Sequence, residues 1–138
     1  MGLGLAHVCF TVRDLGAAVA FYQGKLGLRP AFDFTNAQGE RTGAYLHVGG
    51  RSFIELFAGE LAPAAGGQSY RHLCLEVEDI EGTAARLREQ GVEVTPVQMG
   101  GDGSWQAWLQ DPDGNRIELH QYTAQSLQTE ALARLGTG

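Results

Sequence analysis

The stretch HVCFTVRDL, residues 7–15, returns as HLCLEVEDI at residues 72–80. Both copies fit the pattern His-x-Cys-apolar-x-Val-x-Asp-apolar. A second similarity follows in the same order, because FIEL at residues 53–56 matches RIEL at residues 116–119. The spacing between the two copies of the first motif and the spacing between the two copies of the second differ by no more than the change in length of one loop. Two ordered matches that both retain histidine and glutamate predict a duplicated module.

Each half is predicted to fold as a strand, a helix and three more strands. In the first half, alternating apolar residues predict a strand over 7–12, Asp14 fits a helix N-cap, and Gly27 fits the helix end. The remaining strands of that half are expected near 30–35, 43–49 and 52–58. The second half should run as strand 71–78, helix 80–90 and strands near 92–98, 105–110 and 115–122. The sequence therefore predicts an α+β fold made of two βαβββ modules.

Composition places this chain among compact proteins, with one domain expected over residues 1–122. Its modules should span about 5–60 and 68–122, with a linker at 61–67 and a helical tail at 123–138. The 138 residues are 43% apolar and 19% charged, which is enough to bury a core. We expect the tail to pack on the domain, although it could instead cover a cavity or join subunits.

Charge and hydropathy exclude several kinds of partner. The net charge of -6 disfavours nucleic acid. No stretch approaches the roughly 20 apolar residues that a membrane helix needs, and the N-terminus does not resemble a signal peptide. The two cysteines give no disulfide framework. By default, a cytoplasmic location is expected.

A histidine and a glutamate from each module should share the face of the sheet that points away from the helix. In the first module, His7 and Glu55 alternate with apolar residues that pack under the helix, and His72 and Glu118 occupy the same places in the second. A glutamate flanked by apolar residues is costly to bury without a partner. Two imidazoles and two carboxylates suit zinc, nickel, iron or manganese. We therefore expect these four residues to hold one divalent ion.

Further side chains on the same faces are candidates for contact with a small-molecule substrate. Aromatic walls with a few polar groups are typical of such sites, although several of these residues could simply fill the mouth of a barrel. The candidates are Cys9, Thr11, Tyr45, His47, Phe53, Phe57, Cys74, Trp108, Arg116 and His120.

The repeat, together with AFYQGKLGL at 20–28, FIELF at 53–57 and QDPDGNRIEL at 110–119, resembles the vicinal-oxygen-chelate superfamily. That superfamily includes glyoxalases, bleomycin-resistance proteins and extradiol dioxygenases, and the resemblance covers about residues 5–122. It implies paired βαβββ modules that form a curved open sheet, or half-barrel, around one metal ion. In these proteins a homodimer often completes the sheet, so a homodimer is expected here.

The ligand order His, Glu, His, Glu resembles glyoxalase I in particular. This resemblance implies a metal-dependent lyase or isomerase whose ion binds adjacent oxygens of the substrate while a glutamate moves a proton between neighbouring carbons. Carried over, Glu118 is the main base and Glu55 its counterpart. Glyoxalase I holds glutathione with an arginine and an asparagine, each four positions after a ligand. This chain has Thr11 and Gly59 at those positions, which leaves the substrate open.

The sequence also allows three other functions. A thiol transferase of the fosfomycin-resistance kind resembles the C-terminal half and the tail, but that group lacks a glutamate at the Glu55 position. An extradiol dioxygenase would use iron, and it is commonly a longer chain. A metal-free module that binds an antibiotic or another small molecule usually lacks the ligand set.

Overall fold

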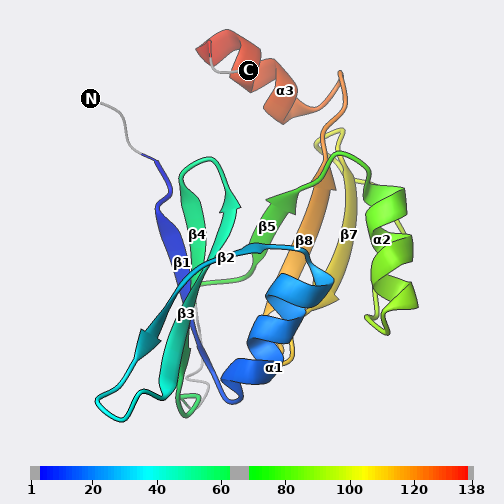
Figure 1. Ribbon diagram of the computed structural model, residues 1–138. Helices are drawn as coiled ribbons and strands as arrows, with labels where there is room; N and C mark the ends of the chain where they lie inside the picture. Colours follow the sequence, from blue (N-terminus) through cyan, green and yellow to red (C-terminus); the bar gives the residue numbers. More distant parts are fainter. Residues whose placement is uncertain (1–3, 63–68, 137–138) are drawn as a thin grey trace. The chain divides into compact units, whose positions relative to one another are not determined.

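The computed structural model describes residues 4–62 and 69–136, which fall into two compact units (Figure 1). The first unit comprises the N-terminal half together with the turn 111–113, and the second comprises the rest of the C-terminal half. Most of the expected linker, residues 63–67, lies outside the described residues. Within those ranges, no helix is both long and apolar enough to cross a bilayer.

The first unit contains a four-stranded sheet. Its strands are β1 (His7–Val12), β2 (Arg29–Thr35), β3 (Arg41–Gly49) and β4 (Ser52–Ala58), in the order β1-β4-β3-β2. Strand β1 runs parallel to β4, and the other neighbours are antiparallel. The observed strands agree closely with the expected ones, because the alternation of apolar residues was clear in each.

The helix of the first unit begins where expected but changes its geometry. The side chain of Asp14 accepts a hydrogen bond from the backbone N–H of Ala17 and caps α1 (Leu15–Val19). The chain then continues as a π-helical turn, η1 (Ala20–Lys25), where an uninterrupted α-helix was expected. Both Phe21 and Tyr22 are buried in this wider turn.

The second unit repeats this arrangement with a shorter edge strand. Its strands are β5 (Leu73–Glu76), β6 (Gln98–Met99), β7 (Trp105–Gln110) and β8 (Arg116–Gln121), in the order β5-β8-β7-β6. Asp79 caps α2 (Ile80–Glu89), which lies alongside the sheet and contacts β7 and β8 (Figure 1). The α+β class and the two βαβββ modules are therefore confirmed.

Two expected strands of the second unit are shorter than predicted. The strand expected at 71–78 forms only over Leu73–Glu76, and that expected at 92–98 is reduced to two residues. Pro96 lacks a backbone donor, and the guanidinium of Arg88 occupies the carbonyl oxygens of Val94 and Thr95. These carbonyl oxygens thus accept from a side chain, while the Thr95 N–H still donates to the carbonyl oxygen of Trp108, and the pairing there is irregular.

The tail forms α3 (Leu127–Leu135), which lies beyond the end of the second sheet rather than across it (Figure 1). The expected packing of this helix involves few apolar contacts, because Leu127 and Leu135 are exposed and Ala131 and Leu132 are only half-buried. Polar groups hold its start instead. The buried hydroxyl groups of Ser104 and Ser126 are hydrogen-bonded, and the Gln128 amide donates to Asp102.

Candidate functional site

In the first unit, strand register brings a cysteine, a tyrosine and a glutamate together on the face that points away from α1. Cys9 lies opposite Glu55 on the parallel pair, and Tyr45 lies opposite it on the antiparallel pair. The Nε2 atom of His7 is 3.4 Å from Oε1 of Glu55, and its Nδ1 atom is 2.9 Å from the Tyr45 hydroxyl. Either the Tyr45 hydroxyl or the Nδ1 atom can be the donor, depending on the tautomer of His7.

Aromatic rings cover the rest of this face. Tyr45 stacks on Phe32 at 4.5 Å between centroids and also contacts Phe53. Phe57 packs on Phe34, as expected for a ring wall. The sequence had not singled out Phe32 and Phe34, although their alternation in β2 was a usable signal.

Two other expected residues of the first unit, His47 and Thr11, have specific surroundings. The Nε2 atom of His47 is 2.9 Å from the carbonyl oxygen of Gly50, so this imidazole is engaged by the turn that follows its own strand. Thr11 lies beside Gly59, where an added Cβ would be 3.1 Å from the threonine methyl group. The two positions that differ from the glutathione-holding pattern are therefore neighbours in space, and neither carries a charge.

In the second unit, a single carboxylate lies between two imidazoles. Glu118 is 8% exposed, its Oε1 is 3.1 Å from Nε2 of His72, and its Oε2 is 2.9 Å from Nε2 of His120. The ring of Trp108 meets His72 edge to face, and the Arg116 guanidinium lies 4.4 Å above that indole. A buried carboxylate with both oxygens engaged is held in one orientation.

Each glutamate also has a cysteine opposite it in the parallel ladder. Cys74 pairs in register with Glu118, as Cys9 does with Glu55. Burial, followed by the charge of Glu118, raises the pKa of the Cys74 thiol to about 12. Burial and then Glu55 also raise the pKa of Cys9. Burial and the nearby carboxylate therefore favour the protonated form of both thiols.

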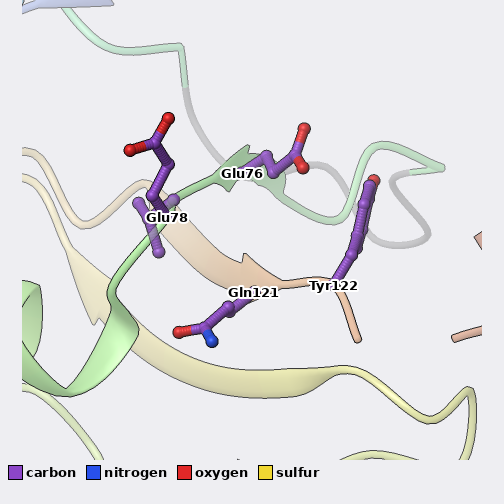
Figure 2. Close-up of a pocket in the computed structure, with 5 residues that line it drawn as sticks. Glu76, Glu78, Gln121 and Tyr122 are labelled. Atoms are coloured by element: carbon purple, nitrogen blue, oxygen red, sulfur yellow. The ribbon is translucent and has the colours of Figure 1, made fainter. Parts of the chain in front are cut away.

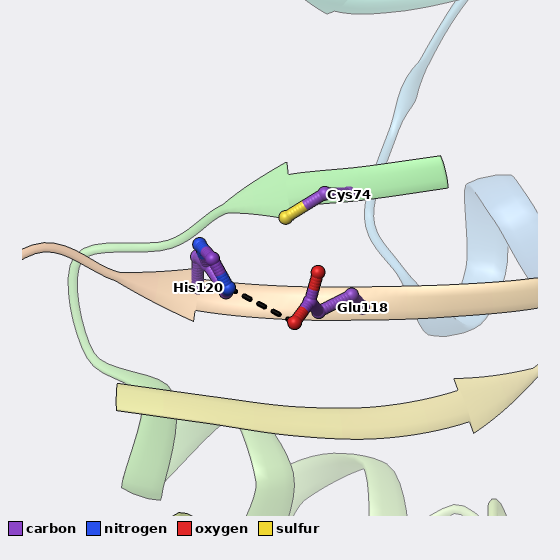
Figure 3. A group of neighbouring side chains, drawn as sticks. All are labelled: Cys74, Glu118 and His120. Carbon is purple, nitrogen blue, oxygen red and sulfur yellow. Dashed lines mark hydrogen bonds and ion pairs between the residues drawn. The ribbon is translucent and has the colours of Figure 1, made fainter. Parts of the chain in front are cut away.

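The sequence-predicted residues thus fall into two clusters, one in each unit. His7 and Glu55 meet in the first, and His72 and Glu118 meet in the second. The sequence assigned His120 and Cys74 to the substrate wall. In the structure, their donor atoms and a Glu118 oxygen lie within 4.8 Å of one another (Figure 3). No sequence signal predicted that three-residue group, because it depends on rotamers.

A hollow of about 420 Å³ lies at the end of the second sheet (Figure 2). Glu76, Val77, Glu78, Gln121 and Tyr122 line it. Figure 2 shows the carboxylate groups of Glu76 and Glu78 apart from each other. Partial burial, with a contribution from Glu76, raises the pKa of Tyr122. This hollow was not anticipated from the sequence.

The chain is similar to known proteins both in sequence and in structure. A family model described as the Glyoxalase/Bleomycin resistance protein/Dioxygenase superfamily matches residues 4–119. A lactoylglutathione lyase from Haemophilus influenzae is 33% identical, over 83% of this chain and 90% of its own. The metallothiol transferase FosB of Shouchella clausii is 28% identical, over 87% and 81%. An antibiotic-binding protein from Streptomyces sp. CB03234 superposes with a TM-score of 0.71 at 28% identity, over 89% and 99%.

Proposed function

The chain belongs to the glyoxalase, bleomycin-resistance and dioxygenase superfamily, and from this premise we propose that it is a metal-dependent, glyoxalase-like lyase or isomerase. Its substrate is a small molecule with two adjacent oxygens. The observation that supports this most directly is Glu118, a buried carboxylate with an imidazole on each oxygen. An uncompensated carboxylate is expensive to bury, and a cation in its surroundings removes that penalty.

The proposed ligands of the ion are the two His–Glu pairs, His7 with Glu55 and His72 with Glu118. The donor set fits a divalent ion, because imidazole nitrogen and carboxylate oxygen suit nickel, zinc, manganese and iron, and two carboxylates offset the charge. The pairs come from one chain or from two copies in a homodimer. When bound, the ion supplies Lewis-acid stabilisation to negative charge on the substrate oxygens.

The protein side chains then position the substrate and move a proton. Glu118 takes a proton from a substrate carbon and returns it to the neighbouring carbon, and Glu55 is its counterpart. The hydrogen bond of Tyr45 to Nδ1 of His7 fixes the orientation of that imidazole. The ring wall formed by Phe32, Phe53 and neighbouring aromatic residues offers a surface for the apolar part of the substrate.

The contacts proposed for the thiol-carrying part of the substrate differ from those of glyoxalase I. Thr11 and Gly59 lie side by side where the resemblance implies an arginine and an asparagine that hold glutathione. A threonine and a glycine offer no charged donor to the carboxylates of glutathione. We therefore propose that the thiol carrier is held by contacts other than these, or that the substrate carries no glutathione.

A second candidate function is thiol transfer of the fosfomycin-resistance kind. It is supported by the similarity to the metallothiol transferase FosB. Glu55 counts against it, because that group lacks a glutamate at this position.

Activity assays on protein loaded with nickel, zinc or manganese test the proposal. We expect turnover of a hemithioacetal of methylglyoxal, with glutathione compared against smaller thiols, and no addition of thiol to fosfomycin. Glu118→Gln should lower the rate by roughly 10²–10⁴-fold, the usual contribution of a positioned base. Glu76→Gln, a change to an exposed carboxylate of the neighbouring strand, is the matched control. Metal-loaded protein that turns over none of these hemithioacetals would contradict the proposal.

A further inference from the structure

The second unit holds three chemically different metal donors in one group, and the proposed function uses only one of them. They are the Cys74 sulfur on β5 and the side chains of Glu118 and His120 on β8. Figure 3 shows the sulfur directed toward the space beside the carboxylate and the imidazole. Glu118 and His120 are each 8% exposed, so two of the three donors are buried polar groups.

The two oxygens of the Glu118 carboxylate contact different histidines. Its Oε1 faces His72, which belongs to the proposed catalytic ligand set, whereas its Oε2 faces His120 at 2.9 Å. The three donor atoms of the sulfur-containing group lie within 4.8 Å of one another. Bonds of about 2.0–2.3 Å to a tetrahedral ion require donors roughly 3.3–3.6 Å apart, so modest rotamer changes would suffice.

We propose that Cys74, Glu118 and His120 form a metal position of their own, which binds a thiophilic divalent ion of the zinc class. Thiolate, imidazole and carboxylate together are ligands that zinc accepts, and sulfur disfavours magnesium and manganese. One thiolate and one carboxylate offset the charge of the ion. The thiol proton passes to solvent on binding, so no oxidant or reductant is needed. Three protein donors leave a fourth place for water.

The first module provides an internal comparison. Cys9 lies opposite Glu55 just as Cys74 lies opposite Glu118. Two residues after Glu55, however, the chain carries Phe57, where the second module carries His120 after Glu118. The first module therefore lacks the imidazole of this three-donor set, and Cys9 is a matched control for Cys74.

This position does not depend on the proposed activity, but it shares Glu118 with the proposed catalytic ligands. A thiophilic ion bound by Cys74 and His120 would occupy the carboxylate proposed as the base. Excess zinc should then inhibit any reaction that uses Glu118, whereas excess manganese should not.

Cobalt titration of the full-length protein tests the proposal. Co²⁺ bound through a thiolate gives a sulfur-to-metal charge-transfer band in the near ultraviolet. We expect this band in the wild-type protein and in Cys9→Ser, and its loss in Cys74→Ser. Far-UV circular dichroism of each variant checks folding, and serine is small enough to keep the β5 backbone unchanged. His120→Gln should also remove or strongly weaken the band.

The remaining outcomes of the cobalt titration either support or contradict the metal position at Cys74, Glu118 and His120. Absence of the band in the wild type, or its persistence in Cys74→Ser, would overturn the proposal. His7→Gln separates it from the proposed function, because that change removes a ligand of the four-residue set and should leave the band intact. A protein that shows the band but turns over no hemithioacetal would support the thiolate site and contradict only the proposed activity.

Discussion

Alanine at position 43 should destabilise the protein, because the structure leaves no room for a methyl group there. Gly43 is buried in β3, and an added Cβ would lie 2.7 Å from Cδ1 of Phe57 and 2.9 Å from the carbonyl oxygen of Leu56. The ring can rotate away, but the backbone oxygen cannot move without disturbing the ladder between β3 and β4. Gly43 therefore permits the Phe57 ring to lie over the strand.

The size of the effect follows from two opposing contributions. Overpacking a core usually costs about 1–3 kcal/mol, while replacing glycine by alanine returns about 0.4–1 kcal/mol through the unfolded chain. We expect a net loss of about 1–2 kcal/mol in the free energy of unfolding. For a chain of this length, the corresponding fall in Tm is roughly 4–8 °C.

Urea denaturation followed by far-UV circular dichroism measures this loss. Gly49→Ala is the matched control, because it lies in the same strand and nothing is within 4 Å of its added Cβ. Its stability should stay within about 0.5 kcal/mol of the wild type. Adding Phe57→Leu to Gly43→Ala should recover only part of the loss, since the Leu56 carbonyl remains. If Gly43→Ala were as stable as the Gly49→Ala control, the packing inferred at this position would be wrong.

Two further predictions concern side chains that act through a neighbour. Tyr45→Phe removes the hydrogen bond to Nδ1 of His7, so we expect the affinity for the metal ion to fall about 10–100-fold. A chelator-competition titration measures this affinity. An unchanged affinity would show that Tyr45 does not support the His7 ligand. Hydrogen bonds from Gln128 and then from the backbone of Ser104 lower the pKa of Asp102 below its ordinary value of 3.8. Because the folded pKa is lowered, this contribution to holding α3 is present above pH 3.8 and is lost as the pH falls through the lower folded value. Amide-exchange protection at the start of α3, corrected for the intrinsic exchange rate at each pH, should fall in that acid range. In Gln128→Ala this protection should already be low at neutral pH.

The sequence was most informative where two patterns agreed. The strands β4 and β7 match the expected ranges 52–58 and 105–110, because apolar alternation and turn residues marked the same bounds. The same alternation correctly placed the His7–Glu55 and His72–Glu118 pairs on shared faces. Alternation depends only on the backbone, which is why it succeeded before any side-chain contact was known.

Features that depend on side-chain competition were not predictable in this way. The guanidinium of Arg88 takes the carbonyl oxygens at residues 94 and 95, and so an expected strand is reduced to Gln98–Met99. The π-helical turn after Val19 and the polar attachment of α3 also depend on side-chain packing and hydrogen bonds that periodicity alone does not reveal. The grouping of Cys74 with His120 likewise required the actual rotamers.

The turn 111–113 has a consequence for how this duplicated chain can be divided. The hydroxyl group of fully buried Tyr22 donates to Asp111 at 2.8 Å, and the Arg13 side chain binds Asp113. A fragment that ended after the first module would leave a buried phenol without this carboxylate acceptor. We therefore expect the N-terminal half to fold poorly when expressed alone, and to recover when the C-terminal half is supplied as a separate chain. In that case the first module depends on a residue that lies 89 positions after Tyr22 in the chain.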